Sequence, residues 1–447
     1  MTTTNAPFRD AFYDLADALF RARQGDERLS LAFDGEESDF VRLNHGRVRQ
    51  PGRVAQRYAT LQLVRGQRHS SGRVSLSGEK ATDLEQLRQL LGSLRAQVEV
   101  LPEDPYLLLP EGVRSTEQIN DNRLPAAEDT VAKVLEQAEG LDLVGIWASG
   151  DIHAGFASSE GQRNWFSSSS FHLDFSAYRQ SDKAVKGSYA GFEWSDDAFA
   201  AKLADMKRKL EVLSREPKTL SPGRYRVFLT PTALEEILGV VGWGGFGLKA
   251  RKTKQTSLLK MSEAGARLHP GVTLVENTKD GVGPGFTAHG FLKPDRVTLI
   301  KEGALGDALV SPRSGKEYGV PHTGWEASEE PHALELAPGS LKSDDALKQL
   351  DTGLWIGNLW YLNYSDRQSC RITGMTRFAT FWVEGGEIRA PVNVMRFDET
   401  VYRMLGDNLE GFTEERELLL DASSYGARST KSSRLPGALV KDFTFTL

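Results

Sequence analysis

Histidines are the residues of this chain best suited to hold a metal ion, yet their spacing argues against the common helical zinc site. The eight histidines are His45, His69, His153, His172, His269, His289, His322 and His332. None of them precedes a glutamate, and none has a second histidine three to five positions later. A helical zinc site needs two histidines on one helix face with a glutamate beside them. Surface or core positions are therefore the simpler interpretation.

Nucleophilic side chains are the next candidates for chemistry. Cys370 is the only cysteine, so an internal disulfide is excluded. The neighbouring Arg371 could lower the pKa of its thiol, but a lone cysteine is more often structural. Ser167–Ser170 supply hydroxyls without a Gly-x-Ser-x-Gly motif around them. An edge strand or a polar-lined groove explains this serine run more simply.

A glycine-rich run, Gly242–Gly247, resembles a phosphate-binding loop in composition but not in position. Dinucleotide loops lie between a strand and the start of a helix. Here the glycines follow a predicted helix, whose C-terminal end disfavours phosphate. The run therefore indicates close backbone packing or a flexible stretch. Arg251, Lys252 and Lys254 come next, and they favour a solvated face or, second, a surface for an anionic partner.

The first half of the chain is predicted to consist of antiparallel strands with flanking helices. Apolar residues at helical spacing predict one helix from Phe8 to Leu19 and another from Leu84 to Val98. Period-two patterns with glycine-containing turns predict antiparallel strands over 29–77 and 141–178. A charged helix is predicted from Asp196 to Leu213.

The second half begins after a polar segment with two prolines, Ser214–Pro222. We expect a domain boundary there, with an N-terminal domain over 1–215 and a C-terminal domain over 216–447. Thr230-Pro231 predicts a helix start, and Gly385-Gly386 predicts a hairpin turn. The expected fold class is α+β, with an antiparallel sheet and flanking helices in the first domain and many antiparallel strands in the second.

Composition narrows the possible partners and the compartment. The 55 Lys and Arg residues are outnumbered by 61 Asp and Glu residues, which gives a net charge of −6. A nucleic-acid binder usually carries a basic excess, so this class is disfavoured. No apolar run reaches the length of about 18 residues that spans a membrane. The N-terminus lacks the pattern of a signal peptide. We therefore expect a cytoplasmic protein without nucleic-acid or membrane partners.

Several blocks of sequence, taken in order, resemble the TldD/PmbA family (peptidase family U62), and specifically its PmbA or TldE side. The blocks are Phe40–Gln50, Ala157–Gly161, Arg251-Lys252 with Ser257–Leu259, Arg296–Gly303 and Phe378–Ile388. Each block is short, but together they extend over nearly the whole chain. The resemblance implies that residues 216–447 are equivalent to the metallopeptidase domain of the family.

The catalytic relatives in this family resemble zinc peptidases with a His-Glu-x-x-x-His helix. Placing that motif by the downstream pair Arg251-Lys252 puts it on residues 238–243. The two histidine positions then hold Leu238 and Trp243, and the glutamate position holds Gly239. A helix without ligands or a base cannot hold zinc or activate water. No catalytic or metal-binding residue is therefore carried over from the family.

The resemblance implies a non-catalytic subunit that pairs with a zinc-bearing TldD-type subunit. Such pairs form a peptidase that acts on unfolded or modified peptides, so zinc is expected in the partner and no cofactor in this chain. Candidates for a cavity or an interface are Arg251, Lys252, His289, His322 and Cys370, beside the degenerate positions.

Two alternatives stay open at this point. One is an independent hydrolase with an unfamiliar site, built from residues such as His289, His322 and Cys370 in the loop-rich second half. The other is a homodimeric peptide-binding or scaffolding protein without peptidase activity. The aromatic residues of the second half, among them Trp360 and Tyr361, favour an interface of that kind, although a packed core explains them as well.

Overall fold

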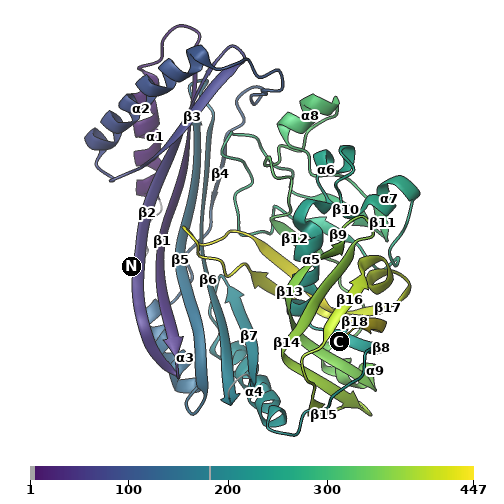
Figure 1. Cartoon of the computed structure of the whole chain (residues 1–447). Helices are drawn as coiled ribbons and strands as arrows, with labels where there is room; N and C mark the ends of the chain where they lie inside the picture. The colour runs from purple at the N-terminus through teal and green to yellow at the C-terminus, as the bar shows by residue number, and fades with distance from the viewer. Residues whose placement is uncertain (1–5, 181–182, 447) are drawn as a thin grey trace.

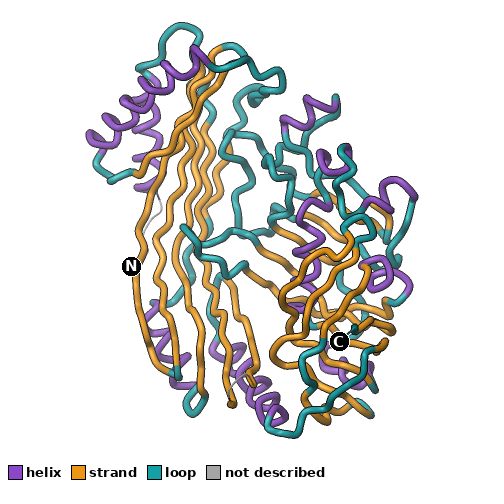
Figure 2. The backbone as a smooth tube through the Cα atoms, viewed as in Figure 1, coloured by secondary structure: helices purple, strands orange, loops and turns teal. Residues whose placement is uncertain are grey.

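Two β-sheets and the helices that cover them form the structure, a computed structural model that describes residues 6–180 and 183–446. In Figure 1 the first sheet, purple to blue, stands as a tall layer beside the green and yellow second sheet. Figure 2 shows that the strands of the first sheet extend along most of the height of the molecule. These long strands give the first sheet a broad face toward the second half of the chain.

The first sheet has seven strands within the described part of the chain, in the order β3-β2-β1-β5-β6-β4, with β7 paired to β6. They are β1 (Arg28–Asn44), β2 (Arg47–Arg65), β3 (Arg68–Ser75), β4 (Thr116–Ile119), β5 (Asp142–Ser158), β6 (Arg163–Gln180) and β7 (Lys183–Gly191). The pairs are antiparallel except for β4 with β6.

Four helices cover one face of this sheet: α1 (Ala6–Phe20), α2 (Lys80–Val100), α3 (Ala127–Gln137) and α4 (Asp196–Leu213). Leu31 of β1 packs with α1 and α2, and Val41 of the same strand packs with α3 and α4. Side chains ten residues apart on a strand point to the same face, because the side-chain period of a strand is two. The opposite face carries polar residues such as Glu36 and Ser170, and it is turned toward the second sheet.

The second sheet has eleven strands among the residues described, in the order β11-β10-β9-β12-β18-β16-β14-β13-β8, with β15 on β14 and β17 on β18. The strands are β8 (Gly223–Leu229), β9 (Leu274–Glu276), β10 (Val297–Lys301), β11 (Ala304–Leu305), β12 (Ala333–Leu336), β13 (Gly353–Asp366), β14 (Arg371–Glu384), β15 (Glu387–Pro391), β16 (Arg396–Thr400), β17 (Leu409–Leu420) and β18 (Ser432–Phe445). A further pairing of β18 with β8 closes a ring through β13, β14 and β16.

Helix α5 (Pro231–Gly245) packs against this ring through Leu234, Ile237 and Val241, which share an apolar core with Leu354 and Ile356 of β13. The shorter helical elements are α6 (Leu248–Lys252), α7 (Leu259–Ala264), α8 (Pro312–Tyr318), η1 (Ser343–Asp345), α9 (Ala346–Leu350) and η2 (Arg403–Asp407). The long helix therefore has one face fixed in the core and another free to line a cavity.

The predicted α+β fold class is confirmed. The helix from Asp196 to Leu213 and the hairpin around Gly385-Gly386 are found as predicted. The second sheet is mixed, because β12 runs parallel to β18 and β13 runs parallel to β8. The division into domains 1–215 and 216–447 stays a prediction. Among the described residues, no helix has the length and apolar character needed to cross a membrane.

Candidate functional site

Helix α5, which carries the degenerate motif, starts where the sequence predicts. The Thr230 hydroxyl accepts a hydrogen bond from the backbone N–H of Ala233 at 3.2 Å, and Pro231 occupies the first helical position. A threonine cap satisfies one of the free N–H groups at the helix start, and proline has no N–H to leave unpaired. These two residues fix the start of α5 and so the register of the residues behind it.

The end of α5 is not a regular helix. Trp243 has a ψ angle of 88°, and Gly244 has a φ angle of 74°. Trp243 still has a helical φ angle of −67°, so the break redirects the backbone that follows it. The Trp243 ring stacks near Tyr364 and lies beneath the Arg367 guanidinium. Gly244 suits this turn, because a left-handed φ angle strains other residues.

The three degenerate positions, Leu238, Gly239 and Trp243, line a cavity of about 220 Å³. The other walls come from the segment before β12 and from both ends of the β17–β18 connection; they include Glu330, Pro331, His332, Asp421, Lys431 and Ser432. The structure thus brings the three predicted positions together in one cavity. Its other walls come from segments that are distant in the sequence. Each of them contributes an apolar or backbone surface there.

Carboxylates give this cavity its electrostatic character. Burial raises the pKa of Glu235 on α5 from 4.5 to about 7, and the nearby carboxylates of Glu236 and Asp421 act in the same direction. Burial also raises the pKa of Glu236, against the opposing effect of Lys186. Lys186 lies on β7, where its ammonium group is 3.2 Å from the Asp174 carboxylate. The wall facing the first sheet therefore changes its charge near neutral pH.

His332 is the imidazole of the cavity, and its surroundings keep it neutral. Burial lowers its pKa to about 3, and the ammonium groups of Lys293 and Lys431 act in the same direction. The Lys293 Nζ lies 3.5 Å from the His332 Nδ1. The backbone N–H of His332 donates to the buried Glu276 carboxylate at 2.9 Å. His332 is therefore held in place as an uncharged side chain.

The residues of this cavity do not fit the zinc ion of the catalytic relatives. Leu238 and Trp243 offer no metal ligand, and Gly239 has no side chain to act as a base. Over residues 6–180 and 183–446, no three His, Cys, Asp or Glu side chains are grouped so that they could hold a metal ion. The cavity is a shaped, partly charged surface without a set of zinc ligands. That zinc belongs to a partner stays a prediction.

Arg251 and Lys252, on the short helix α6, do not line this cavity. The Arg251 guanidinium donates to the backbone oxygens of Gly306 at 3.0 Å and Asp307 at 2.7 Å. Burial lowers the pKa of Arg251 to about 10. Arg251 thus braces the segment after β11, while Lys252 is exposed.

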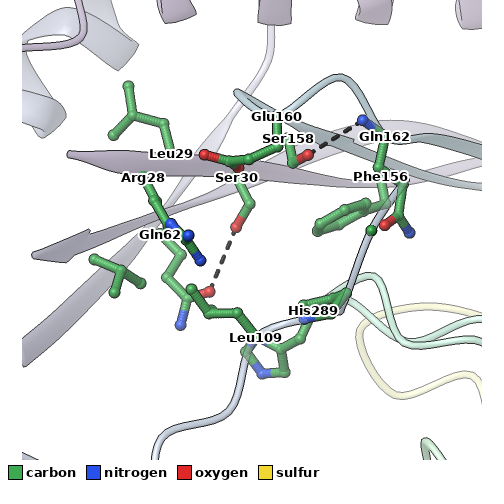
Figure 3. Close-up of a pocket in the computed structure, with 13 residues that line it drawn as sticks. Arg28, Leu29, Ser30, Gln62, Leu109, Phe156, Ser158, Glu160, Gln162 and His289 are labelled. Atoms are coloured by element: carbon green, nitrogen blue, oxygen red, sulfur yellow. Dashed lines mark hydrogen bonds between the residues drawn. The ribbon is translucent and has the colours of Figure 1, made fainter. Parts of the chain in front are cut away.

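His289 borders a second cavity, of about 50 Å³, on the first sheet (Figure 3). Figure 3 shows its ring near Leu109, on the side of the cavity away from Leu29 and Glu160. The Ser30 hydroxyl donates to the Gln62 side chain at 3.4 Å on another wall. This small space is lined by residues of both halves of the chain, including Glu160 and His289, but no hydrogen bond among the described residues joins these two side chains.

His322 and Cys370 lie in two further surroundings. The His322 Nδ1 accepts from the backbone N–H of Gly324 at 3.0 Å, and its ring packs edge-on against Phe291. Cys370 is fully buried, and this burial raises the pKa of its thiol to about 12. In the described part of the chain, no hydrogen bond joins His289, His322 and Cys370. The structure therefore does not assemble these residues into one site.

Sequence reasoning missed the residues that join the cavity to the first sheet. The Arg428 side chain, in the β17–β18 connection, donates to the backbone oxygens of Ser170 and Gly150, both at 2.8 Å. Its Nε lies 3.9 Å from the buried Glu36 carboxylate. Figure 1 shows this connection, in yellow, reaching across to the first sheet. Its only sequence signal is a polar stretch between two strands, which reveals nothing about a contact almost 400 residues away.

Sequence comparison identifies the second half of the chain. Residues 222–447 match the family model of the PmbA/TldA metallopeptidase C-terminal domain. A comparison with curated proteins gives no match. The matched residues contain the whole second sheet and the helix α5 that lines the larger cavity.

Solved structures share the fold over the full length. TldE from Thermococcus kodakarensis has a TM-score of 0.79 at 13% identity and covers 98% of this chain and 100% of its own. A protein from Thermotoga maritima, described as a candidate modulator of a DNA gyrase, has a TM-score of 0.77 at 15% identity, with coverage of 97% and 100%. A Bacteroides thetaiotaomicron protein with the corresponding description has a TM-score of 0.72 at 15% identity, with coverage of 99% and 99%. Identities this low show a shared fold alone. The family model, however, extends over residues 222–447, which is half of the chain, and the protein therefore belongs to the TldD/PmbA family.

Proposed function

We propose that this chain is a non-catalytic, TldE-like subunit that pairs with a zinc-bearing TldD-type subunit. The pair would form a cytoplasmic peptidase that acts on unfolded or modified peptides. One observation carries the proposal: Leu238, Gly239 and Trp243 line the cavity where a catalytic relative would present His, Glu and His.

If one subunit carries the zinc and the other only holds the peptide, the second can keep the cavity wall without keeping the zinc ligands. Zinc in a peptidase polarises the peptide carbonyl and activates water, so one metal site is enough for cleavage. The subunit without the metal would shape the chamber and hold the peptide. In this chain Glu330 and Asp421 would place carboxylates along that wall. Lys431 pairs with Glu330 at 3.4 Å, and neutral His332 adds no further positive charge.

The test is a metal and activity measurement on the purified chain, alone and after co-expression with a chain that carries His-Glu-x-x-x-His. We expect the chain alone to contain no stoichiometric zinc and to cleave no unfolded peptide. The co-purified complex should contain about one zinc per pair and should lose cleavage when a chelator removes the metal. A matched control replaces both motif histidines of the co-expressed chain with alanine, which should abolish zinc and cleavage while the complex still forms.

Two outcomes would contradict this proposal. Chelator-sensitive cleavage by the isolated chain would show an independent hydrolase, and loss of that activity in His322→Ala or Cys370→Ala would locate its site. A stable homodimer that binds peptide but does not co-purify with any motif-bearing chain would show a binding or scaffolding protein instead.

A further inference from the structure

Strand β2 leaves part of the first sheet with an open edge. On one side β2 pairs with β1 along its whole length, but β3 covers the other side only from Tyr58 to Arg65. The backbone oxygen of Arg57 is also engaged, because it accepts from Leu76. Within residues 6–180 and 183–446, no strand pairs with the outer side of residues 47–56. Alternate N–H and C=O groups of this segment are therefore free to pair with another chain.

The open segment is strongly basic in a chain that is acidic as a whole. Residues 47–56 contain Arg47, Arg49 and Arg53 and no acidic residue. All three arginines are exposed, and no ion pair in the described part of the structure involves them. The net charge of the chain is −6. This edge is thus a local region of positive potential, which attracts an acidic partner.

Two features limit which part of the edge can accept a strand. The register moves from Arg42 opposite Gln50 to Leu43 opposite Val48, so Arg49 is the extra residue of a β-bulge. Pro51 lacks a backbone N–H. The regular part of the open edge is therefore Gly52–Gln56. Basic side chains protect such an edge from other basic strands, but they do not repel an acidic one.

Two cavities flank this edge on opposite faces of the sheet. One, of about 870 Å³, is lined by Asp39 and Val41 of β1; the other, of about 360 Å³, is lined by Arg42 and Val54. Phe40 and Gly52 border both. Successive side chains of a strand point to opposite faces, so a strand added at this edge would send its side chains alternately toward the two cavities.

The two cavities differ in chemistry. The larger one is mainly apolar: Ala127, Val131 and Leu135, spaced four apart, form a ridge of α3 along it, and its charged members are Asp39, Arg53 and Glu128. The smaller one contains Arg42 and Arg53 beside Ile146, and no acidic residue lines it. The first cavity favours apolar side chains, and the second favours carboxylates.

We propose that the outer edge of β2 at Gly52–Gln56 is a docking site for an extended, acidic peptide segment of another protein. The segment adds to the sheet as a strand and alternates apolar with acidic residues. Its apolar side chains lie on the α3 ridge, and its carboxylates face Arg42. Arg53, which lies opposite Asp39 in the pairing with β1, is exposed at the edge itself and borders both cavities. This addition of a strand uses main-chain pairing for affinity and the two cavities for specificity. The site is on the first sheet, away from the α5 cavity, and it does not depend on the proposed subunit role.

Fluorescence anisotropy with a labelled heptapeptide of alternating valine and glutamate tests this site on the full chain. We expect saturable binding that weakens as salt increases, because the arginines contribute through charge. A peptide of the same composition with its glutamates in one block should bind about tenfold more weakly or worse. Two further peptides carry N-methyl groups on alternate residues. The peptide whose methyl groups replace the N–H donors facing β2 should not bind, and the peptide methylated on the other set of residues should bind normally.

Paired variants connect the binding to this edge. Arg42→Glu with Arg53→Glu should abolish binding of the alternating peptide, while Arg88→Glu, on the exposed face of α2, should leave it unchanged. Circular dichroism of the wild type, the double variant and Arg88→Glu establishes that all three proteins fold. Equal binding of both peptides, insensitivity to N-methylation, or full binding by the double variant would overturn the proposal. Self-association without peptide binding, abolished by Arg53→Glu, would also overturn it and would assign the edge to a second copy of this chain.

Discussion

Glu235 shows how burial alone can make one residue respond to pH in this cavity. It lies on α5 with Glu236 beside it and Asp421 across the cavity, and Lys186 only partly offsets these carboxylates. Its pKa of about 7 exceeds the ordinary value of 4.5. Ionising such a group in the folded state is unfavourable. The native protein therefore binds a proton that the unfolded chain has already released between these two values.

We expect Glu235→Gln to change the pH dependence of stability. For the wild-type protein, the contribution of Glu235 to the free energy of unfolding falls as pH rises from about 4.5 to about 7, because the native state binds more protons there. The variant should lose this fall, so it should be more stable than wild type above neutral pH and nearly equal to it below about pH 4.5. Urea unfolding across this range measures it. Exposed Glu103→Gln is the control; the same profile in both variants would contradict the role of Glu235.

At the scale of one element, α5 separates what the sequence predicts from what it does not. Its start depends on Thr230 and Pro231, two neighbours in sequence, and could be predicted. Its irregular end depends on Arg367, whose guanidinium stacks near Trp243 and Tyr364 and donates to the Trp243 backbone oxygen at 2.8 Å. Such a contact, over more than 120 residues, leaves no local pattern. The glycines there indicate close backbone packing or a flexible stretch, and nothing about Arg367.

Two glycines of α5 should respond oppositely to the same substitution. Gly244→Ala places a Cβ 2.5 Å from the Arg367 Nη2 at a φ angle of +74°, so it should destabilise the protein by about 1–2 kcal/mol. Gly239→Ala meets no atom within 4 Å in a helical segment and should stabilise the protein by about 0.5–1 kcal/mol. Thermal unfolding of the two variants measures the difference. Equal effects of the two would mean that the break at Trp243 does not persist in solution.

The β17–β18 connection should be held by its buried arginine. Arg428→Met removes the cationic group beside the buried Glu36 carboxylate, which keeps hydrogen bonds from Gln56 and from the backbone N–H of residue 428. It also leaves the backbone oxygens of Ser170 and Gly150 without their donor, so it should lower the free energy of unfolding by about 3–5 kcal/mol. Adding Glu36→Gln to that variant should restore part of the loss. Urea unfolding of the four forms gives the coupling energy. Arg371→Met breaks the more exposed pair with Asp398 and should change stability by about 1 kcal/mol or less. Additive effects of the Arg428 and Glu36 changes would contradict the pairing.

For the whole molecule, the periodicity of the sequence predicted the α+β class, whereas the order of the strands in each sheet depends on long-range contacts. The closed ring of the second sheet depends on β8 meeting β18, which are about 200 residues apart in the chain. The degenerate positions Leu238, Gly239 and Trp243 came from the family resemblance. Their neighbours His332, Asp421 and Lys431 could not be found in the same way, because they come from other segments and form no motif of their own.

The two halves of the chain share an apolar cluster, so we expect neither to fold stably alone. Phe381 and Ala379 of β14 pack in one cluster with Phe199 and Leu203 of α4. Fragments 1–215 and 216–447 should each expose this surface and bind a hydrophobic dye, and mixing them should reduce the dye signal. Sedimentation and dye fluorescence measure both effects. Separate cooperative unfolding of each fragment without dye binding would show instead two independent domains.

The central position of β18 has a consequence for the synthesis of this protein. This strand pairs with β8, β12, β16 and β17, yet it is made after all of them. On the ribosome these four strands emerge first, with apolar faces and unpaired edges, and they wait for Ser432–Phe445. Such edges are where nascent chains pair wrongly with one another. A chaperone that shields the growing chain until β18 emerges would meet this need, and a premature stop codon before Ser432 would leave the second sheet without its centre.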